Sequence, residues 1–168
     1  PLYHCPDNNI NKYFYKLFQK MIFELVEYLI HRGLHQPKTS KHFPYHRNHH
    51  RTYQTDHDYR TNKSLLKSLF EQVLAVFVFS MAWSYGFIAL YTAWAILIYN
   101  LTHFISHIDL FPTIRAYHKA HHRDPLKNMG ISSPAVDWFM GTMNDDFIVK
   151  NPILLILPAP LSFLAIEH

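Results

Sequence analysis

The sequence is poor in cysteine, which cross-links small secreted domains, and in glycine, which forms nucleotide-binding loops. One cysteine, Cys5, among 168 residues excludes an internal disulfide framework. The four glycines form no nucleotide-binding loop. Charged residues make up only 17%, whereas 49% are apolar and 16% aromatic. No secretory signal is visible, and a chain that starts at Pro1 and stops at His168 after an apolar run fits a fragment or a processed form.

Charge is missing altogether from one long stretch. Residues 72–108 contain no Asp, Glu, Lys or Arg. A single helix of that length would measure about 55 Å, well beyond the roughly 30 Å hydrocarbon core of a bilayer. Two helices that turn near Ser84-Tyr85-Gly86 would each fit one crossing. We therefore predict a transmembrane hairpin, and because basic residues flank it on both sides but are absent from its tip, its two ends should lie on the cytoplasmic side.

Histidine is abundant, and its spacing repeats. An HxxxH pair followed by an HxxHH triplet occurs once on each side of the charge-free stretch. Together these clusters hold ten of the fourteen histidines: His31, His35, His46, His49, His50, His103, His107, His118, His121 and His122. Side chains at i, i+3 and i+4 of a helix lie on one face, so each cluster aims its imidazoles at one region.

Neutral imidazole is the commonest metal ligand among side chains, and ten nitrogens supply about five for each of two first-row transition ions. The clusters before and after the hairpin can meet only if the chain crosses the membrane an even number of times. The plainer alternative is a set of solvated histidines in basic loops. A third possibility is a metal-binding or metal-transport protein without catalytic activity.

A helix predicted from about Tyr13 to Ile30 leads into the first histidine pair. Its polar residues form one stripe, and its apolar remainder should face lipid or partner helices. The stripe consists of Lys16, Lys20, Glu24, Glu27, His31 and His35. Glu24 or Glu27 could hydrogen-bond a ligand imidazole from outside the coordination shell. An amphipathic helix lying on a membrane surface is the alternative.

Other segments carry weaker signals. His42 lies four residues before His46 and is expected outside the coordination shell or in solvent, and His57 among charged neighbours is expected at the surface. Pro112 predicts a break before the helix of His118, and residues 137–142 should form a small packed turn. The apolar run from Pro152 to Ile166 is short for a crossing, so a truncated span or a re-entrant segment is expected.

These motifs together resemble the fatty acid hydroxylase/sterol desaturase superfamily of integral-membrane di-metal oxygenases. The likeness covers about residues 18–142: Glu24 matches an acid before the first box, and the four histidine clusters match the family's boxes in order. Asn128-Met129-Gly130 and Phe139-Met140-Gly141-Thr142 match the end of the motif, with Met129 in place of tyrosine and Asp137-Trp138 in reversed order. The family's amino-terminal membrane hairpin is not present in the sequence given.

The resemblance implies a non-haem di-iron oxidoreductase that hydroxylates or desaturates a lipid C–H bond in a fatty acyl chain or sterol. It implies the ten histidines as iron ligands. Zinc is possible in purified protein, because the affinity order of nitrogen sites favours it over Fe²⁺. Glu24, Glu27, His42 and Asn128 are expected just outside the ligands. O₂ would be the co-substrate. Because the chain has no haem-binding or nucleotide-binding motif, electrons from NAD(P)H would arrive through cytochrome b5 or a ferredoxin with its reductase.

The predicted fold is therefore all-α: one domain over residues 1–168, an integral-membrane helical bundle with a transmembrane hairpin and a cytoplasmic, histidine-rich metal-binding cap. In a eukaryote the membrane would be that of the endoplasmic reticulum, and no nucleic-acid partner is expected. A carotenoid ring hydroxylase is the main rival within the enzyme class. It shares the four-cluster scheme, but its first box has one more residue between the histidines and it lacks the FGT-like ending.

Overall fold

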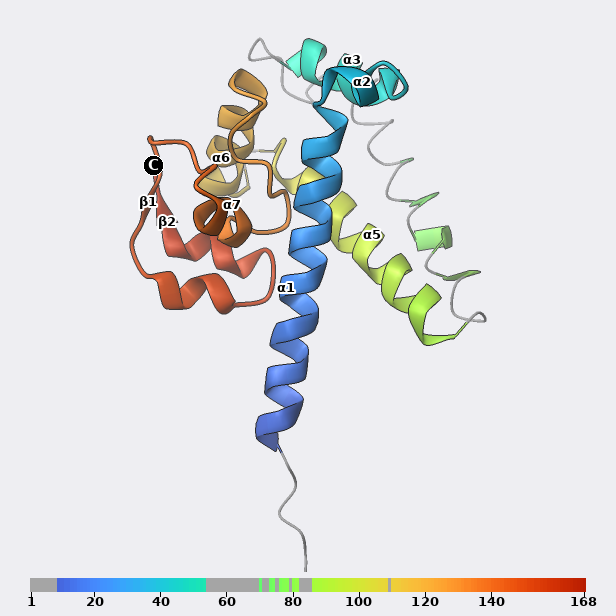
Figure 1. Ribbon diagram of the computed structural model, residues 1–168, viewed down its shortest axis with the longest axis vertical. Coiled ribbons are helices and arrows are strands. Elements are labelled where there is room, and N and C mark those ends of the chain that lie inside the picture. Colours follow the sequence, from blue (N-terminus) through green and yellow to red (C-terminus); the bar gives the residue numbers. More distant parts are fainter. Residues whose placement is uncertain are drawn as a thin grey trace, which may run out of the picture.

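The computed structural model describes residues 9–53, 70, 73–74, 76–78, 80–81, 86–108 and 110–168. Figure 1 shows a long central helix with shorter elements around it. The helices are α1 (Asn9–Leu34), α2 (Pro37–Ser40), α3 (Pro44–Tyr53), α5 (Phe87–Ile105), α6 (Pro112–Arg123) and α7 (Ala135–Met140). The carboxyl-terminal elements are strand β1 (Ile148–Val149), the 3₁₀ helices η2 (Pro152–Ile156) and η3 (Leu161–Ala165), and strand β2 (Ile166–Glu167).

Helix α1 has its polar side buried and its apolar side exposed, the reverse of an ordinary helix on a soluble domain. Glu24, Glu27 and His31 are only 3%, 7% and 2% exposed, whereas Leu29 and Ile30 are 54% and 60% exposed. The predicted polar stripe is thus confirmed as interior from Glu24 to His31, whereas Lys16 nearer the amino terminus is exposed. The helix is longer at both ends than the sequence predicted, because it runs from Asn9 to Leu34 and not only from Tyr13 to Ile30.

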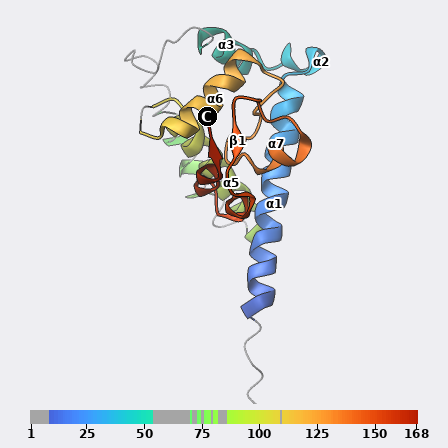
Figure 2. The ribbon, with the colours of Figure 1, turned by 90° about the vertical axis from the view of Figure 1, so that its left-hand side faces the viewer.

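Proline sets the starts of the helices that carry the histidine triplets. Pro44 begins α3 and Pro112 begins α6, at positions where the missing N–H costs no helical hydrogen bond. The predicted break at Pro112 is confirmed. Both views place α2 and α3 across the carboxyl-terminal end of α1, which brings His31 and the triplet of α3 to the same end of the molecule (Figures 1 and 2).

The second half of the charge-free stretch is described as α5, which begins after Gly86 and carries His103 in its last turn. Of the first half, only residues 73–74, 76–78 and 80–81 are described, and they are helical. The predicted first helix and the turn at residues 84–85 lie mostly outside the described residues. Among the residues that the structure describes, no helix is both long enough and apolar enough to cross a membrane.

The carboxyl-terminal run does not form the truncated membrane-spanning helix that was one of the two expectations from the sequence. It forms η2 and η3, joined at their outer ends by the antiparallel pairing of β1 with β2. Proline at residues 152, 158 and 160 prevents a continuous helix and favours these short turns. They pack on α6 in a core made of Ile114, Tyr117, Ala120, Phe147, Leu155, Phe163, Ala165 and Ile166.

Candidate metal centre

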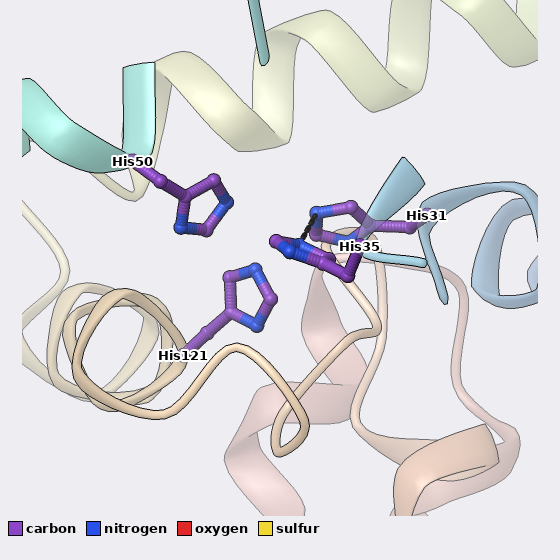
Figure 3. A group of neighbouring side chains, drawn as sticks. All are labelled: His31, His35, His50 and His121. Carbon is purple, nitrogen blue, oxygen red and sulfur yellow. Dashed lines mark hydrogen bonds between the residues drawn. The ribbon is translucent and has the colours of Figure 1, made fainter. Parts of the chain in front are cut away.

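All ten histidines singled out from the sequence lie in one interior cluster. Two groups of four have ring nitrogens within 4.8 Å of one another. The first group is His31, His35, His50 and His121, and the second group is His49, His103, His107 and His118. Figure 3 shows the rings of the first group turned toward a common space from α1, the turn after it, α3 and α6.

His46 and His122 complete the cluster, one beside each group. His46 Nε2 lies 3.1 Å from His35 Nε2 in the first group. His122 Nε2 lies 3.0 Å from His118 Nε2 in the second. The two groups also touch, because the rings of His50 and His122 are stacked with their centroids 4.3 Å apart. The cluster is therefore one continuous body of imidazoles with two centres.

Each half of the sequence contributes one histidine to the group that is formed mainly by the other half. In each half, the HxxxH pair and the two outer histidines of the triplet serve one group, and the middle histidine serves the other. Thus His49 belongs to the second group although its neighbours His46 and His50 lie with the first, and His121 is exchanged in the opposite direction. Residues i+3 and i+4 project about 100° apart on a helix, so one triplet can face two centres.

Backbone carbonyls fix how two of the imidazoles are protonated. His31 Nδ1 lies 2.6 Å from the Met129 carbonyl oxygen, and His121 Nδ1 lies 2.8 Å from that of Lys127. A carbonyl oxygen only accepts, so both Nδ1 atoms carry the proton and both Nε2 atoms present a lone pair. Nε2 of His121 is buried without a hydrogen-bond partner in the described structure, as are both ring nitrogens of His50.

Burial keeps these imidazoles neutral, which is the form that binds metal. Burial, followed by the nearby His35, lowers the pKa of His46 to about 4. Burial also lowers the pKa of His122 to about 3, with His103 as the next cause. The pKa values of His31 and His121 are shifted in the same direction for the same main reason.

The donors fit metal ions better than they fit one another. His118 Nε2 lies 2.9 Å from His107 Nε2 and 3.0 Å from His122 Nε2, and a single ring nitrogen cannot donate to both. Two nitrogens on opposite sides of a shared ion would be about 4.2 Å apart, twice the roughly 2.1 Å metal–imidazole bond. The donors of each group all lie within 4.8 Å of one another, so small shifts would bring them around one ion.

The residues predicted just outside the histidines have other contacts. Glu24 pairs with Lys20 at 2.7 Å, and Glu27 accepts from the N–H groups of Ile131 and Ser132. Among the described contacts, no hydrogen bond joins either carboxylate to an imidazole. His42 is exposed. Asn128 is buried, but its side chain bonds the backbone of Tyr117 and Asn144. His57 lies outside the described residues.

Asp137 was missed as a part of this site, although the sequence placed it in a packed turn. It is 0% exposed and accepts four hydrogen bonds, two of them from the N–H groups of Met129 and Gly130. The remaining two come from the hydroxyls of Tyr117 and Thr142. The sequence did contain a signal for Asp137: an acidic residue shortly after Gly130 and shortly before Gly141-Thr142.

An apolar cavity of about 350 Å³ runs between α1 and α5 and ends at the first group. Residues of both helices line it: Ile22, Phe23, Val26, Glu27, Ile30, His31, Leu34, Tyr91, Thr92, Ala95, Ile96 and Tyr99. Its size falls in the range of small-molecule sites, roughly 300–1,000 Å³. The Tyr99 ring also lies 5.8 Å from that of His103, so the cavity approaches the second group as well.

A helical protein with two histidine groups that could hold metal ions, at the end of an apolar cavity, has the features expected of an enzyme that acts on apolar molecules. The sequence matches the family model for fatty acid hydroxylases over residues 17–142, three quarters of the chain. The chain therefore belongs to the fatty acid hydroxylase family, within the fatty acid hydroxylase/sterol desaturase superfamily, and membership indicates an oxidoreductase. No curated protein and no solved structure matches the chain.

Proposed function

We propose that this protein uses O₂ to oxidise an unactivated C–H bond of a lipid, in a fatty acyl chain or a sterol, at a di-iron centre held by the ten histidines. The observation that carries the proposal is the cavity between α1 and α5, which is apolar along its length and has His31 in its wall. A substrate without polar groups near the reacting carbon can be held there by burial alone.

A pair of iron ions held by the two groups would supply the O₂-activating chemistry. The chain's own residues supply the rest. The backbone carbonyls of Lys127 and Met129 accept from Nδ1 of His121 and His31, so the Nε2 lone pairs of these two rings remain for the first group. Apolar residues such as Val26, Ile30 and Ala95 bring the hydrocarbon up to His31 and exclude water, which protects a strong oxidant from side reactions.

The exposed apolar face of α1 supports a location in a membrane, where the substrate resides. Met21, Leu29 and Ile30 are more than half exposed. Burial of such side chains in lipid stabilises each by about 1.5–3 kcal/mol. We place the histidine centre on the cytoplasmic side, because basic residues flank the charge-free stretch and none lies at its tip.

An external electron donor is part of the proposal. Hydroxylation of a C–H bond places one oxygen atom of O₂ in the product and the other in water, which consumes two electrons and two protons. No described residue of the chain is a redox group that could supply the electrons. Cytochrome b5, or a ferredoxin with its NAD(P)H-dependent reductase, meets this need.

The test is a comparison of lipids in a host that expresses the chain with a redox partner. Mass spectrometry should find a new hydroxyl group or double bond with the unmodified chain and with His168→Ala, an exposed residue outside both groups. His121→Ala should abolish the product. Unchanged lipids together with altered cellular metal content would instead support a metal-binding protein without catalysis.

A further inference from the structure

One peptide group connects a metal-site histidine to a buried carboxylate. The carbonyl oxygen of Met129 accepts from His31 Nδ1 at 2.6 Å. The N–H of Gly130, at the other side of the same peptide group, donates to Asp137 Oδ2 at 2.6 Å. A continuous path therefore runs from carboxylate to peptide to imidazole, and the Nε2 of that imidazole faces the first group.

The hydrogen-bond partners of Asp137 favour its charged form, against the opposing effect of burial. All four described contacts to its oxygens come from donors: two backbone N–H groups and the hydroxyls of Tyr117 and Thr142. A proton on the carboxyl group would replace one of these accepted hydrogen bonds. Burial raises the pKa of Asp137, and the same hydrogen bonds oppose that shift.

The connecting loop is held so that the Met129 carbonyl cannot turn away from His31. Four successive N–H groups, from Met129 to Ser132, end on two carboxylates, with Asp137 taking the first two and Glu27 the last two. Gly130 permits this close approach, because an added Cβ would lie 2.9 Å from Asp137 Oδ2 and would collide with the Ser133 carbonyl oxygen.

His121 provides an internal comparison. Its Nδ1 donates to the carbonyl of Lys127, and the N–H of that peptide group, on Asn128, donates to the carbonyl of Thr142 at 2.9 Å. The second acceptor in this path is a neutral carbonyl, whereas the path from His31 ends on a carboxylate. The two imidazoles of one group therefore differ in the charge that lies behind them.

We propose that Asp137 is a positioning residue that acts on His31 through the Met129–Gly130 peptide group. Hydrogen bonds in a chain polarise one another, so the carboxylate makes the Met129 oxygen a stronger acceptor and His31 Nε2 a stronger ligand. The proposal rests on the metal centre of the proposed function. It assigns to Asp137 an effect on one ion of the pair.

The test measures the binding of Co²⁺ to the full chain, by absorption and by competition with a chelator. Asp137→Asn should weaken the binding of one of two ions by about 10–100-fold, the usual effect of losing an outer partner of a histidine ligand. Tyr117→Phe is the matched control, since it removes a hydrogen bond to the same carboxylate but leaves its charge and its bond to Gly130. Tyr117→Phe should keep both affinities even where thermal stability falls.

A double variant separates positioning from general loss of structure. In a His31→Ala background, Asp137→Asn should cause no further loss of Co²⁺ affinity, because the residue through which it acts is gone. An additive effect there, equal weakening of both ions, or the same effect from Tyr117→Phe would overturn the proposal.

A measurement on the unmodified protein does not depend on how a variant folds. With zinc bound and histidine labelled with ¹⁵N, NMR should find His31 protonated at Nδ1, and protonation at Nε2 would overturn the proposal. An unmodified chain that binds no metal would refute the proposed function and this inference together. Two ions in the unmodified chain with unchanged affinities in Asp137→Asn would overturn this inference alone.

Discussion

The two histidine groups are built from the same repeated pattern, yet they are supported differently. Each receives an HxxxH pair and the outer histidines of a triplet from one half of the sequence, and the middle histidine of a triplet from the other. The hydrogen bonds from Nδ1 of His31 to the Met129 carbonyl and from Nδ1 of His121 to the Lys127 carbonyl both orient ligands of the first group. The repeat thus supplies the ligands, and a loop outside the repeat orients part of one group.

The exchange of middle histidines gives the largest predicted effect. Single removal of His49 or His121 should lower product formation by more than about 100-fold, beyond the loss expected for an outer partner. The double variant His31→Ala with His121→Ala damages only the first group and should retain about one metal ion per chain. His118→Ala with His121→Ala damages both groups and should retain none.

Metal analysis of the purified variants checks this prediction. If the halves were independent, His118 and His121 would serve the same ion, and their double variant would be the one that keeps a metal. That reversed result would break the comparison between the groups.

The cavity distinguishes the two histidine groups, because the histidine in its lining, His31, belongs to the first group. Ala95→Phe should fill part of the cavity and lower product formation by about tenfold, because less room remains for the hydrocarbon and a rise of about 1.4 kcal/mol in the activation free energy is tenfold in rate. Metal content should stay at the level of the unmodified chain. Leu101→Phe is the control, because Leu101 lies on the same helix, is exposed and does not line the cavity.

Kinetics with a lipid substrate and metal analysis on the same preparations distinguish the outcomes. Equal product formation by Ala95→Phe and Leu101→Phe would show that the substrate reaches the centre by another route. Loss of metal in Ala95→Phe would mean that the cavity supports the centre rather than the substrate.

A fall in pH should lower the free energy of unfolding, because the buried imidazoles resist protonation in the folded protein. The pKa of His46 defines the pH range of this effect. Burial lowers its pKa from the ordinary 6.5 to about 4. Between these values the unfolded chain takes up a proton that the folded chain does not, so the free energy of unfolding falls as the pH falls. Above about pH 6.5 both states are neutral and this dependence disappears.

Denaturant unfolding of the metal-free protein between pH 7.5 and 4 measures the effect. His46→Gln should reduce the slope of stability against pH, because it removes one of the groups responsible. A stability that does not change across this range would contradict the burial of neutral imidazoles.

The smallest effect is expected outside both groups. His42 and His168 are exposed, and replacement of either by alanine should change stability by no more than about 0.5 kcal/mol. Metal content and product formation should remain those of the unmodified chain. Loss of metal in His42→Ala would place a further ligand in the first group, four residues before His46.

Spacing alone predicted which histidines gather, because helical periodicity determines the face on which each lies. It could not predict that His49 and His121 change groups, since that depends on how α3 and α6 pack against each other. The roles expected for Glu24 and Glu27 as partners of imidazoles differ from their contacts, because Lys20 and the 131–132 backbone satisfy these carboxylates. A truncated span in the carboxyl-terminal run was wrong, because the prolines of this run favour 3₁₀ turns, which hydropathy does not distinguish from a short span.

The most direct test is the number and ligation of metal ions in the unmodified chain. Elemental analysis of iron-loaded protein, combined with X-ray absorption spectroscopy, should find two ions per chain, each surrounded mainly by imidazole nitrogen. A single ion per chain, or ligation mainly by oxygen, would contradict the two histidine centres on which the proposed function depends.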